Sequence, residues 1–358
     1  MNFIGLSFDH MHMGDLLRQV ASHPGGQVVA LCDDNPQNDA VMRQFARELG
    51  VPDERVFTDY ARCLSEVKAD VAIVCAAVSR HAELCELAAG AGAHVLVEKP
   101  FAFSLADADA MIEATQKANV KLAINWPTAW YAPYLTAKRL IDENTIGELI
   151  EVHTNGGNRG PLHHGAGKEA RSPDEINAAK NASWFYQKDA GGGSLLDYMG
   201  YGATLGTWFF GGQKPLEIAA MTFVPPGLEV EEHSIAIGNY GRGLSKWETR
   251  WGTSTDPWTH QPQPKTGYVL KGTRGTIAAY EYEPTIRVQT EINPAGYEVK
   301  VDAVQPPYRG PIEHFIAHLN GLVPLHGPLT PEISRIGQQI VDTARESAAR
   351  GKTLKLLD

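Results

Sequence analysis

A lysine, an aspartate and a tyrosine form the first set of residues that could carry out chemistry. Lys99 stands in the run Glu98-Lys99-Pro100 at the end of a predicted strand, where an ammonium group could hold a substrate hydroxyl. Asp197 and Tyr201 lie four residues apart on a predicted helix that follows the glycines at 191–193, so both side chains should project from one face. An ammonium group near a tyrosine favours the phenolate, and we therefore expect Lys99 to lower the pKa of Tyr201 and make proton transfer possible.

Each of these residues also has an ordinary structural role open to it. Lys99 could be a solvated charge at a strand end, and Asp197 a solvated or capping acid. Tyr201 could be a half-buried aromatic side chain. For an arbitrary pair with this spacing the structural roles are the commoner ones, so the surrounding sequence has to decide.

The loop after the first predicted strand carries the second set. Dinucleotide sites on parallel sheets normally have Gly-x-Gly-x-x-Gly here, because the turn needs positive φ and the backbone must approach the pyrophosphate. The three glycine positions are occupied by Phe8, His10 and Met13. Free N–H groups and the dipole at the start of the next helix could still bind phosphate. Asp33 or Asp34 ends the second strand, where a carboxylate accepts from ribose hydroxyls and repels a 2′-phosphate, so we expect NAD rather than NADP.

The same loop raises the question of a metal site. His10 and His12 form a His-x-His pair, but the sequence shows no well-spaced third donor, and loop histidines commonly hydrogen-bond locally. We therefore predict no metal and assign Phe8, Asp9, His10 and Met13 to a variant cofactor loop. The four cysteines contain no Cys-x-x-Cys pair, and we expect them to be reduced core residues.

The elements that must position these residues differ between the two parts of the chain. Apolar runs at 3–6, 28–32, 56–57, 71–75, 94–97 and 120–124 alternate with helical patterns such as 40–49 and 105–118. This alternation is typical of parallel strands joined by crossover helices, and it predicts a doubly wound sheet. Right-handed crossovers bring the loops after the first, second, fourth and fifth runs to one ligand-binding edge.

The second part of the chain has a different pattern. We expect helices at 134–144, 195–210, 313–322 and 331–350 and a polar loop at 155–181. Strand-like runs at 216–223, 234–240, 244–251, 267–270, 276–282 and 285–289 predict a large, mostly antiparallel open sheet. We therefore divide the α/β chain into a dinucleotide-binding domain, 1–124, and a substrate-binding and oligomerisation domain, 125–358, whose last helices pack back on the first.

Aromatic and polar side chains after the sixth strand could shape a sugar pocket. Trp126, Trp130 and Tyr131 follow that strand, and the loop at 155–181 contributes Arg159 and His163. Carbohydrate sites combine planar polar donors with aromatic faces, although a solvated loop and core tryptophans explain each residue equally well.

Four motifs together resemble the glucose-fructose oxidoreductase / inositol dehydrogenase (Gfo/Idh/MocA) family. They are Glu98-Lys99-Pro100, Ile146-Gly147-Glu148, the run 191–197 and Trp208-Phe209-Phe210-Gly211, and they span nearly the whole chain in order. The resemblance implies a Rossmann domain that binds NAD(P), and a second domain whose open sheet carries the sugar or polyol and commonly mediates oligomers.

The resemblance also implies roles for single residues. It matches Lys99 to the family's lysine, Asp197 to its acid and Tyr201 to its catalytic histidine, which is also a tyrosine in the glucose-fructose oxidoreductase branch. His81 falls where members have a histidine near the cofactor. The expected cofactor contacts are Phe8, Asp9, His10, Met13, Asp33, Asp34, Ala76, His81, Glu98 and Lys99, and the expected substrate contacts are Trp126, Trp130, Arg159, His163 and Tyr201.

Charge and hydropathy restrict the partners. The chain of 358 residues has 42 acidic side chains against 32 lysines and arginines, and this net charge of −10 argues against nucleic acid or anionic membranes as partners. It contains no apolar run of about 18 residues that could span a membrane. We expect a cytoplasmic homo-oligomer, a dimer or tetramer, that acts on a small carbohydrate or polyol.

The leading hypothesis is an NAD-dependent oxidoreductase acting on a secondary alcohol of a sugar, glycoside or polyol. Tyr201 would take the hydroxyl proton, Lys99 would orient the oxygen, and Asp197 would hold the substrate or tune the pair. Two alternatives stay open. One is a redox-neutral sugar or glycoside transformation with tightly held NAD, and the other is a non-catalytic sensor of dinucleotide or sugar.

Overall fold

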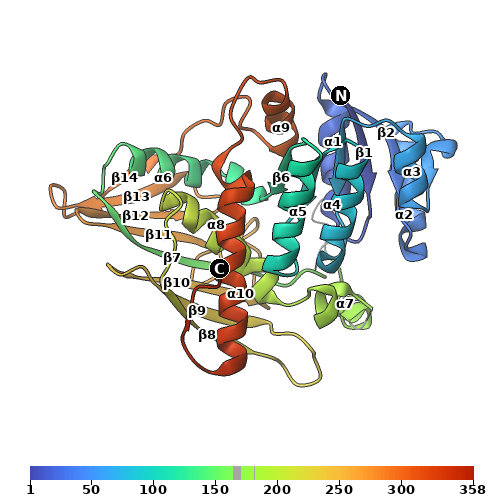
Figure 1. Ribbon diagram of the computed structural model, residues 1–358. Helices are drawn as coiled ribbons and strands as arrows, with labels where there is room; N and C mark the ends of the chain where they lie inside the picture. Colours follow the sequence, from blue (N-terminus) through green and yellow to red (C-terminus); the bar gives the residue numbers. More distant parts are fainter. Residues whose placement is uncertain (164–170, 181) are drawn as a thin grey trace.

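The computed structural model describes residues 1–163, 171–180 and 182–358, and these residues form two sheets with helices (Figure 1). The first sheet has six parallel strands in the order β3-β2-β1-β4-β5-β6. The second has nine strands in the order β14-β13-β12-β11-β7-β10-β9-β8-β15, and in it β7 and β10 are a parallel pair within an otherwise antiparallel sheet. The predicted fold class, a doubly wound sheet followed by a mostly antiparallel open sheet, is confirmed.

The N-terminal strands are continuous apolar runs because helices cover both faces of their sheet. Every residue of β4, for example, is buried. The strand order reverses between β1 and β4, so the loops after these strands diverge and leave a crevice at the carboxyl edge. The elements are β1 (Asn2–Leu6), α1 (His12–Ser22), β2 (Gln27–Cys32), α2 (Asp39–Leu49), β3 (Val56–Phe57), α3 (Tyr60–Glu66), β4 (Val71–Val74), α4 (His81–Gly90), β5 (His94–Glu98), α5 (Leu105–Lys117) and β6 (Leu122–Asn125).

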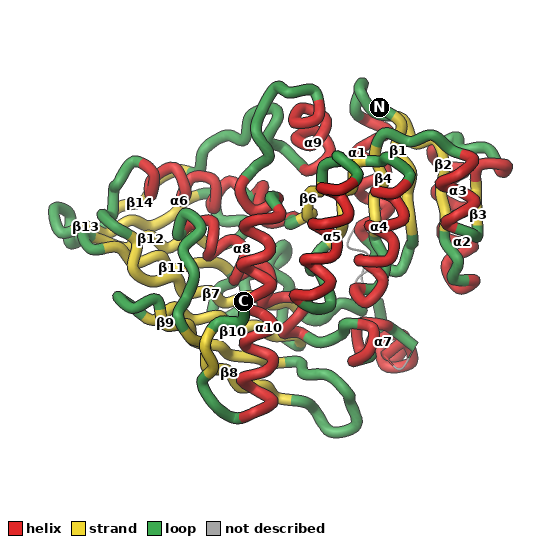
Figure 2. The backbone as a smooth tube through the Cα atoms, in the orientation of Figure 1, coloured by secondary structure: helices red, strands yellow, loops and turns green. Residues whose placement is uncertain are grey.

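One face of the second sheet is covered by helices, as Figure 2 shows. Helix α8 packs on β7, α6 on β12, and α10 on both α8 and β8. The elements are α6 (Ala132–Asp142), β7 (Leu149–Asn158), α7 (Pro173–Lys180), a π-helix (Leu195–Met199), α8 (Gly200–Phe209), β8 (Glu217–Phe223), β9 (His233–Asn239), β10 (Leu244–Trp251), β11 (Gly267–Gly272), β12 (Gly275–Tyr280), β13 (Thr285–Thr290), β14 (Tyr297–Lys300), α9 (Pro311–Leu319), α10 (Pro331–Arg350) and β15 (Leu354–Lys355).

The prediction of a polar loop over 155–181 is wrong at both ends of that segment. Residues 155–158 belong to β7, which pairs with β10 on one side and β11 on the other. Their Asn-Gly-Gly-Asn sequence is typical of turns, but a Cβ on Gly157 would lie 2.3 Å from the Arg250 carbonyl oxygen, so here the glycine permits close strand approach. Residues 173–180 form α7, and residues 164–170 and 181 lie outside the described part of the chain.

The C-terminal helices contact helices that flank the first sheet. Helix α9 contacts α1, and α10 contacts α5. Near the start of α5, the backbone N–H of Leu105 donates to the Asp342 carboxylate at 2.6 Å. These contacts join the two sheets through the C-terminal segment, and the division of the chain near residue 124 stays a prediction.

The other notable features are a set of buried thiols and an uncovered sheet face. The four cysteines are free and buried, as expected. Met221 and Phe223 on β8 keep 80% and 59% of their surface exposed. Among the helices of the described residues, none combines the length and apolarity needed to cross a membrane.

Candidate active site

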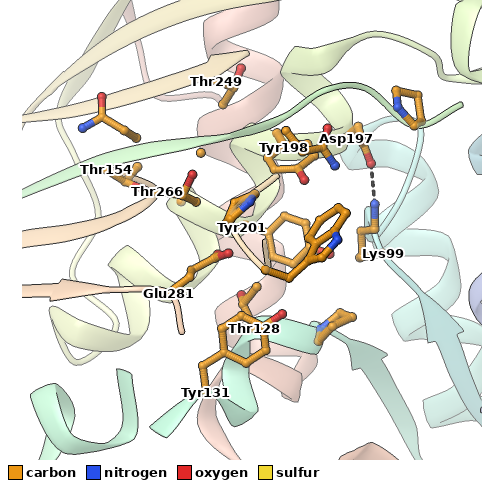
Figure 3. A pocket seen from close by; sticks show the side chains of 18 of the residues that line it. Lys99, Thr128, Tyr131, Thr154, Asp197, Tyr198, Tyr201, Thr249, Thr266 and Glu281 are labelled. Atoms are coloured by element: carbon orange, nitrogen blue, oxygen red, sulfur yellow. Dashed lines mark hydrogen bonds and ion pairs between the residues drawn. The ribbon is translucent and has the colours of Figure 1, made fainter. Parts of the chain in front are cut away.

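A buried ion pair lies between the two domains. Lys99 at the end of β5 bonds through Nζ to Oδ1 of Asp197 in the π-helix, and both side chains are buried (Figure 3). The indole Nε1 of Trp251, at the end of β10, donates to the second oxygen, Oδ2, at 3.1 Å. Both carboxylate oxygens are therefore engaged, which is what a buried charge needs to be tolerated.

Glycines allow the chain to present Asp197 at this point. Gly191 and Gly193 have φ of 90° and 108°, values that other residues rarely adopt. A Cβ on Gly193 would lie 2.4 Å from Oε1 of Glu231, and that oxygen accepts from the backbone N–H of Leu195 at 2.8 Å. The turn that follows is π-helical, a geometry that often occurs at functional sites.

Tyr201 lies beside the ion pair. Lys99 Nζ is 5.4 Å from the centre of its ring, and Trp126 packs edge-on against it at 5.3 Å. Burial raises the pKa of Tyr201 well above its usual value, and the carboxylates of Glu98 and Asp197 raise it further. The expectation that Lys99 lowers this pKa is therefore wrong, because Asp197 already neutralises the ammonium. Tyr201 is a protonated hydrogen-bond donor at neutral pH.

A pocket opens over the ion pair. Lys99, Asp197 and Tyr201 all contribute to its lining, and hydroxyl, carboxylate and amide groups stand among aromatic faces. At one side the hydroxyl groups of Tyr131 and Tyr282 are 2.6 Å apart. The other lining residues include Thr128, Tyr134, Thr154, Asn155, Asn158, Tyr198, Thr249, Trp258, Thr266, Tyr268 and Glu281.

Two of the predicted substrate contacts pack into the core instead of lining this pocket. Trp126 is buried and donates through Nε1 to Ser334 Oγ at 2.9 Å. Trp130 is buried with its ring centre 5.2 Å from those of His314 and His326. Trp126 therefore packs against Tyr201 without lining the pocket itself.

Arg159 and His163 also lie outside the pocket lining. The backbone N–H of Arg159 donates to Asp256 at 3.0 Å, and burial, together with the Arg159 charge, lowers the pKa of His163. Residues of β7 and β10, such as Thr154 and Thr249, line the pocket in their place. Recognising residues 155–158 as strand would have identified the β7 positions.

The crevice at the carboxyl edge of the first sheet is the second part of the site. It has a volume of about 710 Å³ and is lined by Phe8, Asp9, His10 and Met13, all of which were predicted as cofactor contacts, and by Asn35, Asn38, Ala77 and Arg80 among others. His10, Met11, Pro161 and Phe185 line both the crevice and the pocket, so the two spaces meet at these residues.

The two acids at the end of β2 do not line the crevice. Asp33 is buried, and its carboxylate accepts from the backbone N–H groups of Phe8 at 2.6 Å and Asn35 at 2.8 Å. Asp34 forms two hydrogen bonds with Arg80, at 2.6 and 2.9 Å, which lower its pKa. Asp33 thus holds the loop after β1 in place, while Asp34 holds Arg80.

Asp9 stands inside the crevice. Its carboxylate accepts from the backbone N–H of Ala77 at 3.0 Å and from the side-chain amides of Asn38 at 2.8 Å and Asn35 at 3.2 Å. One carboxylate therefore connects the loops after β1, β2 and β4. The turn that directs it there uses Ser7, which takes the positive φ, 68°, that a glycine would normally supply.

The remaining predicted cofactor residues are buried beneath the loops. Both ring nitrogens of His81 face carbonyl oxygens, Nδ1 that of Phe101 at 3.2 Å and Nε2 that of Ala76 at 3.1 Å. His81 thus joins the loops after β4 and β5, and burial lowers its pKa. Ala76 is buried next to this contact, and neither residue lines the crevice.

Glu98 is fully buried and connects two other elements. Its Oε1 is 2.8 Å from His12 Nδ1, and its Oε2 accepts from Asn125 Nδ2 at 2.7 Å. His10 lies next to His12, with 4.4 Å between the ring centres.

The crevice lies where a nicotinamide dinucleotide binds on a doubly wound sheet. It lies where the strand order reverses, and the first turn of α1 forms part of its wall. The first two N–H groups of α1 already donate to His10, that of His12 to Nδ1 and that of Met13 to the carbonyl oxygen, each at 3.2 Å, so this helix end offers a phosphate chiefly its dipole. Gly14 brings α1 close to α2, since a Cβ there would lie 2.2 Å from the Phe45 ring.

Comparison with known proteins agrees with this geometry. The profile described as the oxidoreductase family with NAD-binding Rossmann fold matches residues 2–126, and the GFO/IDH/MocA C-terminal domain matches residues 134–278. D-apiose dehydrogenase from Paraburkholderia graminis is 33% identical over 123 residues, 34% of this chain and 32% of that protein. Myo-inositol 2-dehydrogenase from Thermotoga maritima is 33% identical over 107 residues, 30% of this chain and 31% of that protein. The chain thus aligns with about a third of the length of these relatives.

Solved structures share the whole fold. An oxidoreductase from Agrobacterium radiobacter, in complex with NAD+, L-tartaric acid and magnesium, superposes with a TM-score of 0.77 at 18% identity, covering 99% of this chain and 98% of that one. The WlbA dehydrogenase from Bordetella pertussis, in complex with NADH and UDP-GlcNAcA, gives 0.78 at 18% identity, covering 100% and 98%. With both domains matched in order, the chain belongs to the Gfo/Idh/MocA oxidoreductase family, and residues 2–126 form its NAD-binding Rossmann fold.

Proposed function

We propose that this oxidoreductase transfers a hydride between NAD and a secondary alcohol of a sugar, glycoside or polyol. The observation that carries the proposal is the buried pair of Lys99 and Asp197 with Tyr201 beside it, at the place where the dinucleotide crevice meets a polar, aromatic pocket. A hydride donor and a bound alcohol carbon would have to meet at such a junction.

The residues of the chain supply the proton and the orientation. NAD, when bound, supplies the hydride acceptor. Tyr201, protonated at neutral pH, donates its O–H to the substrate oxygen when a ketone is reduced, and in its ionised form it accepts the proton when the alcohol is oxidised. Asp197 fixes Lys99 beside the same oxygen, so the pair acts as one positioning unit.

The shape and chemistry of the pocket support a polyhydroxylated substrate. The ring of Tyr198 suits the C–H surface of a sugar, while Thr154, Thr249 and Glu281 offer partners for hydroxyl groups. The names of the relatives, D-apiose dehydrogenase and myo-inositol 2-dehydrogenase, point to the same class.

Preference for NAD over NADP is also part of the proposal. Asp34 adds negative charge at the end of β2, and its two hydrogen bonds occupy the Arg80 guanidinium that a 2′-phosphate would otherwise bind. A 2′-phosphate would therefore meet a carboxylate and an arginine that is already paired.

Replacement of Tyr201 tests the proposal. The Tyr201→Phe variant removes only the hydroxyl, and we expect turnover of the best substrate in a panel of sugars and polyols to fall roughly 10²–10⁴-fold. Tyr297→Phe, an exposed tyrosine on β14, is the matched control and should keep full turnover. Equal turnover in both variants would remove Tyr201 from the chemistry.

We also propose that the uncovered sheet face mediates a homodimer or homotetramer. Met221, Phe223 and Ile237 expose apolar surface on β8 and β9, and a neighbouring copy would bury it. A monomer in sedimentation analysis at micromolar concentration would contradict this assignment.

A further inference from the structure

Three potential metal ligands converge at the junction of the crevice and the pocket. They are His10 in the loop after β1, His12 at the start of α1 and Glu98 at the end of β5, and one ligand atom from each lies within 4.8 Å of the others. The third donor is 86 residues away in sequence from His12, which explains why the sequence shows only a His-x-His pair. We propose that these residues bind one divalent transition-metal ion of the zinc class, a site independent of the hydride transfer proposed above.

The ligand types suit such an ion. Two imidazoles and one carboxylate form the protein ligand set of catalytic zinc centres, which leave another coordination position open for water or substrate. Shifts of roughly 1 Å would bring all three ligand atoms to about 2.0–2.2 Å from a common point. His12 Nδ1 and Glu98 Oε1, 2.8 Å apart, already approach the spacing of neighbouring ligands on one ion.

The local charge balance also favours a cation here. Glu98 and Asp197 are buried carboxylates, and Lys99 forms its ion pair with Asp197. Within the described residues, the ion pair of Glu98 is with His12 alone, and that pair is charged only if the imidazole is protonated. Buried carboxylates are normally paired or coordinate metals, so a divalent ion would compensate the remaining negative charge.

The surroundings hold the ligands in place. Asn125 donates to Glu98 Oε2 at 2.7 Å, the kind of outer contact that orients a ligating carboxylate. The backbone N–H of His12 donates to His10 Nδ1 at 3.2 Å, and Phe185 packs edge-on against the His10 ring at 5.6 Å. His10, His12 and Lys99 line the pocket and Glu98 is buried next to Lys99, so the ion would lie at the junction of the pocket and the crevice.

Zinc binding to the full-length protein in the absence of dinucleotide tests the proposal. The protein is stripped with a chelator and titrated with Zn²⁺, and with Co²⁺ as a spectroscopic probe. We expect one bound ion per chain, and we expect the visible absorption spectrum of protein-bound Co²⁺ to differ from that of free Co²⁺. His12→Gln and Glu98→Gln should abolish both, and Asn125→Ala should weaken binding roughly 10–100-fold.

Controls separate ligand loss from misfolding. His260→Gln changes an exposed histidine outside the crevice and the pocket and should bind the metal as the unchanged protein does. His12 is partly exposed, so its variant should keep the native circular dichroism spectrum even if the variant of buried Glu98 does not. If the unchanged protein binds no Zn²⁺, or if His12→Gln binds it as tightly as His260→Gln, the proposal is overturned. Neither outcome depends on turnover, so failure of this site and failure of the proposed reaction can be told apart.

Discussion

The dinucleotide crevice and the substrate pocket hold their carboxylates in different ways. Asp9 within the crevice and Asp33 buried beside it accept hydrogen bonds from neutral amide and backbone N–H groups. In the pocket, Asp197 is paired with the ammonium of Lys99. Neutral donors stabilise a carboxylate without removing its charge, whereas an ion pair neutralises it.

This contrast has a functional consequence. The crevice keeps the negative charge of Asp9, whereas in the pocket the charge of Asp197 is neutralised by Lys99. We therefore expect the loss of one member of the ion pair to lower the stability of the protein. A change of net charge in the crevice should instead change the affinity for the dinucleotide.

The largest effect should come from breaking the pair in the pocket. Lys99→Met removes the ammonium and leaves the Asp197 carboxylate buried and unpaired, which should cost about 3–5 kcal/mol of unfolding free energy. Replacing both partners, Lys99→Met with Asp197→Leu, should recover much of that loss because no charge stays buried. Urea denaturation followed by tryptophan fluorescence measures both variants. A double variant as unstable as the sum of the single ones would show that the charges do not depend on each other.

The next effect concerns pH and the pocket's proton donor. Because the pKa of Tyr201 is raised, the phenol is protonated at neutral pH. As long as the pH stays below that pKa, each increase of one pH unit raises the fraction of phenolate, the form that can accept a proton, roughly tenfold. The rate of alcohol oxidation should therefore rise between about pH 7 and 9, by up to roughly 100-fold if proton transfer limits it. The rate of ketone reduction, which uses the protonated form, should stay level.

Tyr201→Phe provides the control for this pH profile. Its residual oxidation rate should lose the slope, while Tyr297→Phe should keep it. A slope that survives in Tyr201→Phe would assign the titration to another group.

The same two regions show what the sequence could and could not predict. Strands buried on both faces consist of continuous apolar runs, so all six strands of the first sheet were predicted. Lys99 and Asp197, both predicted as site residues from their motifs, line one pocket. No strand was predicted at β7, and its end was assigned to a loop because Asn-Gly-Gly-Asn resembles a turn when its two partner strands are not known.

The directions of side chains and the contacts between distant residues could not be predicted from the sequence. Trp126 and Asp33 were expected to reach ligands, yet one donates inward to Ser334 and the other accepts from the backbone of Phe8. Both follow strands that end at the ligand-binding edge, and the sequence places them there without saying which way they point. Likewise, only the fold shows that Glu98 meets His12.

The smallest effect should come from the crevice. Asp9→Asn keeps the size and polarity of the side chain but removes a negative charge from the space expected for the dinucleotide. At a separation of about 4 Å in water, two unit charges interact by about 1 kcal/mol, so the variant should bind NADH roughly fivefold more tightly. Titration of tryptophan fluorescence with NADH measures the change, and the gain should shrink as salt screens the charges.

Asp53→Asn provides the matched control, since it removes the same charge from an exposed position outside the crevice lining. If both variants bind NADH alike, the effect comes from net charge alone. If Asp9→Asn binds NADH more weakly than the unchanged protein, the hydrogen bonds of Asp9 to Ala77, Asn35 and Asn38 matter more than its charge. The carboxylate would then be a structural replacement for the missing glycines, holding together the three loops that a dinucleotide must contact.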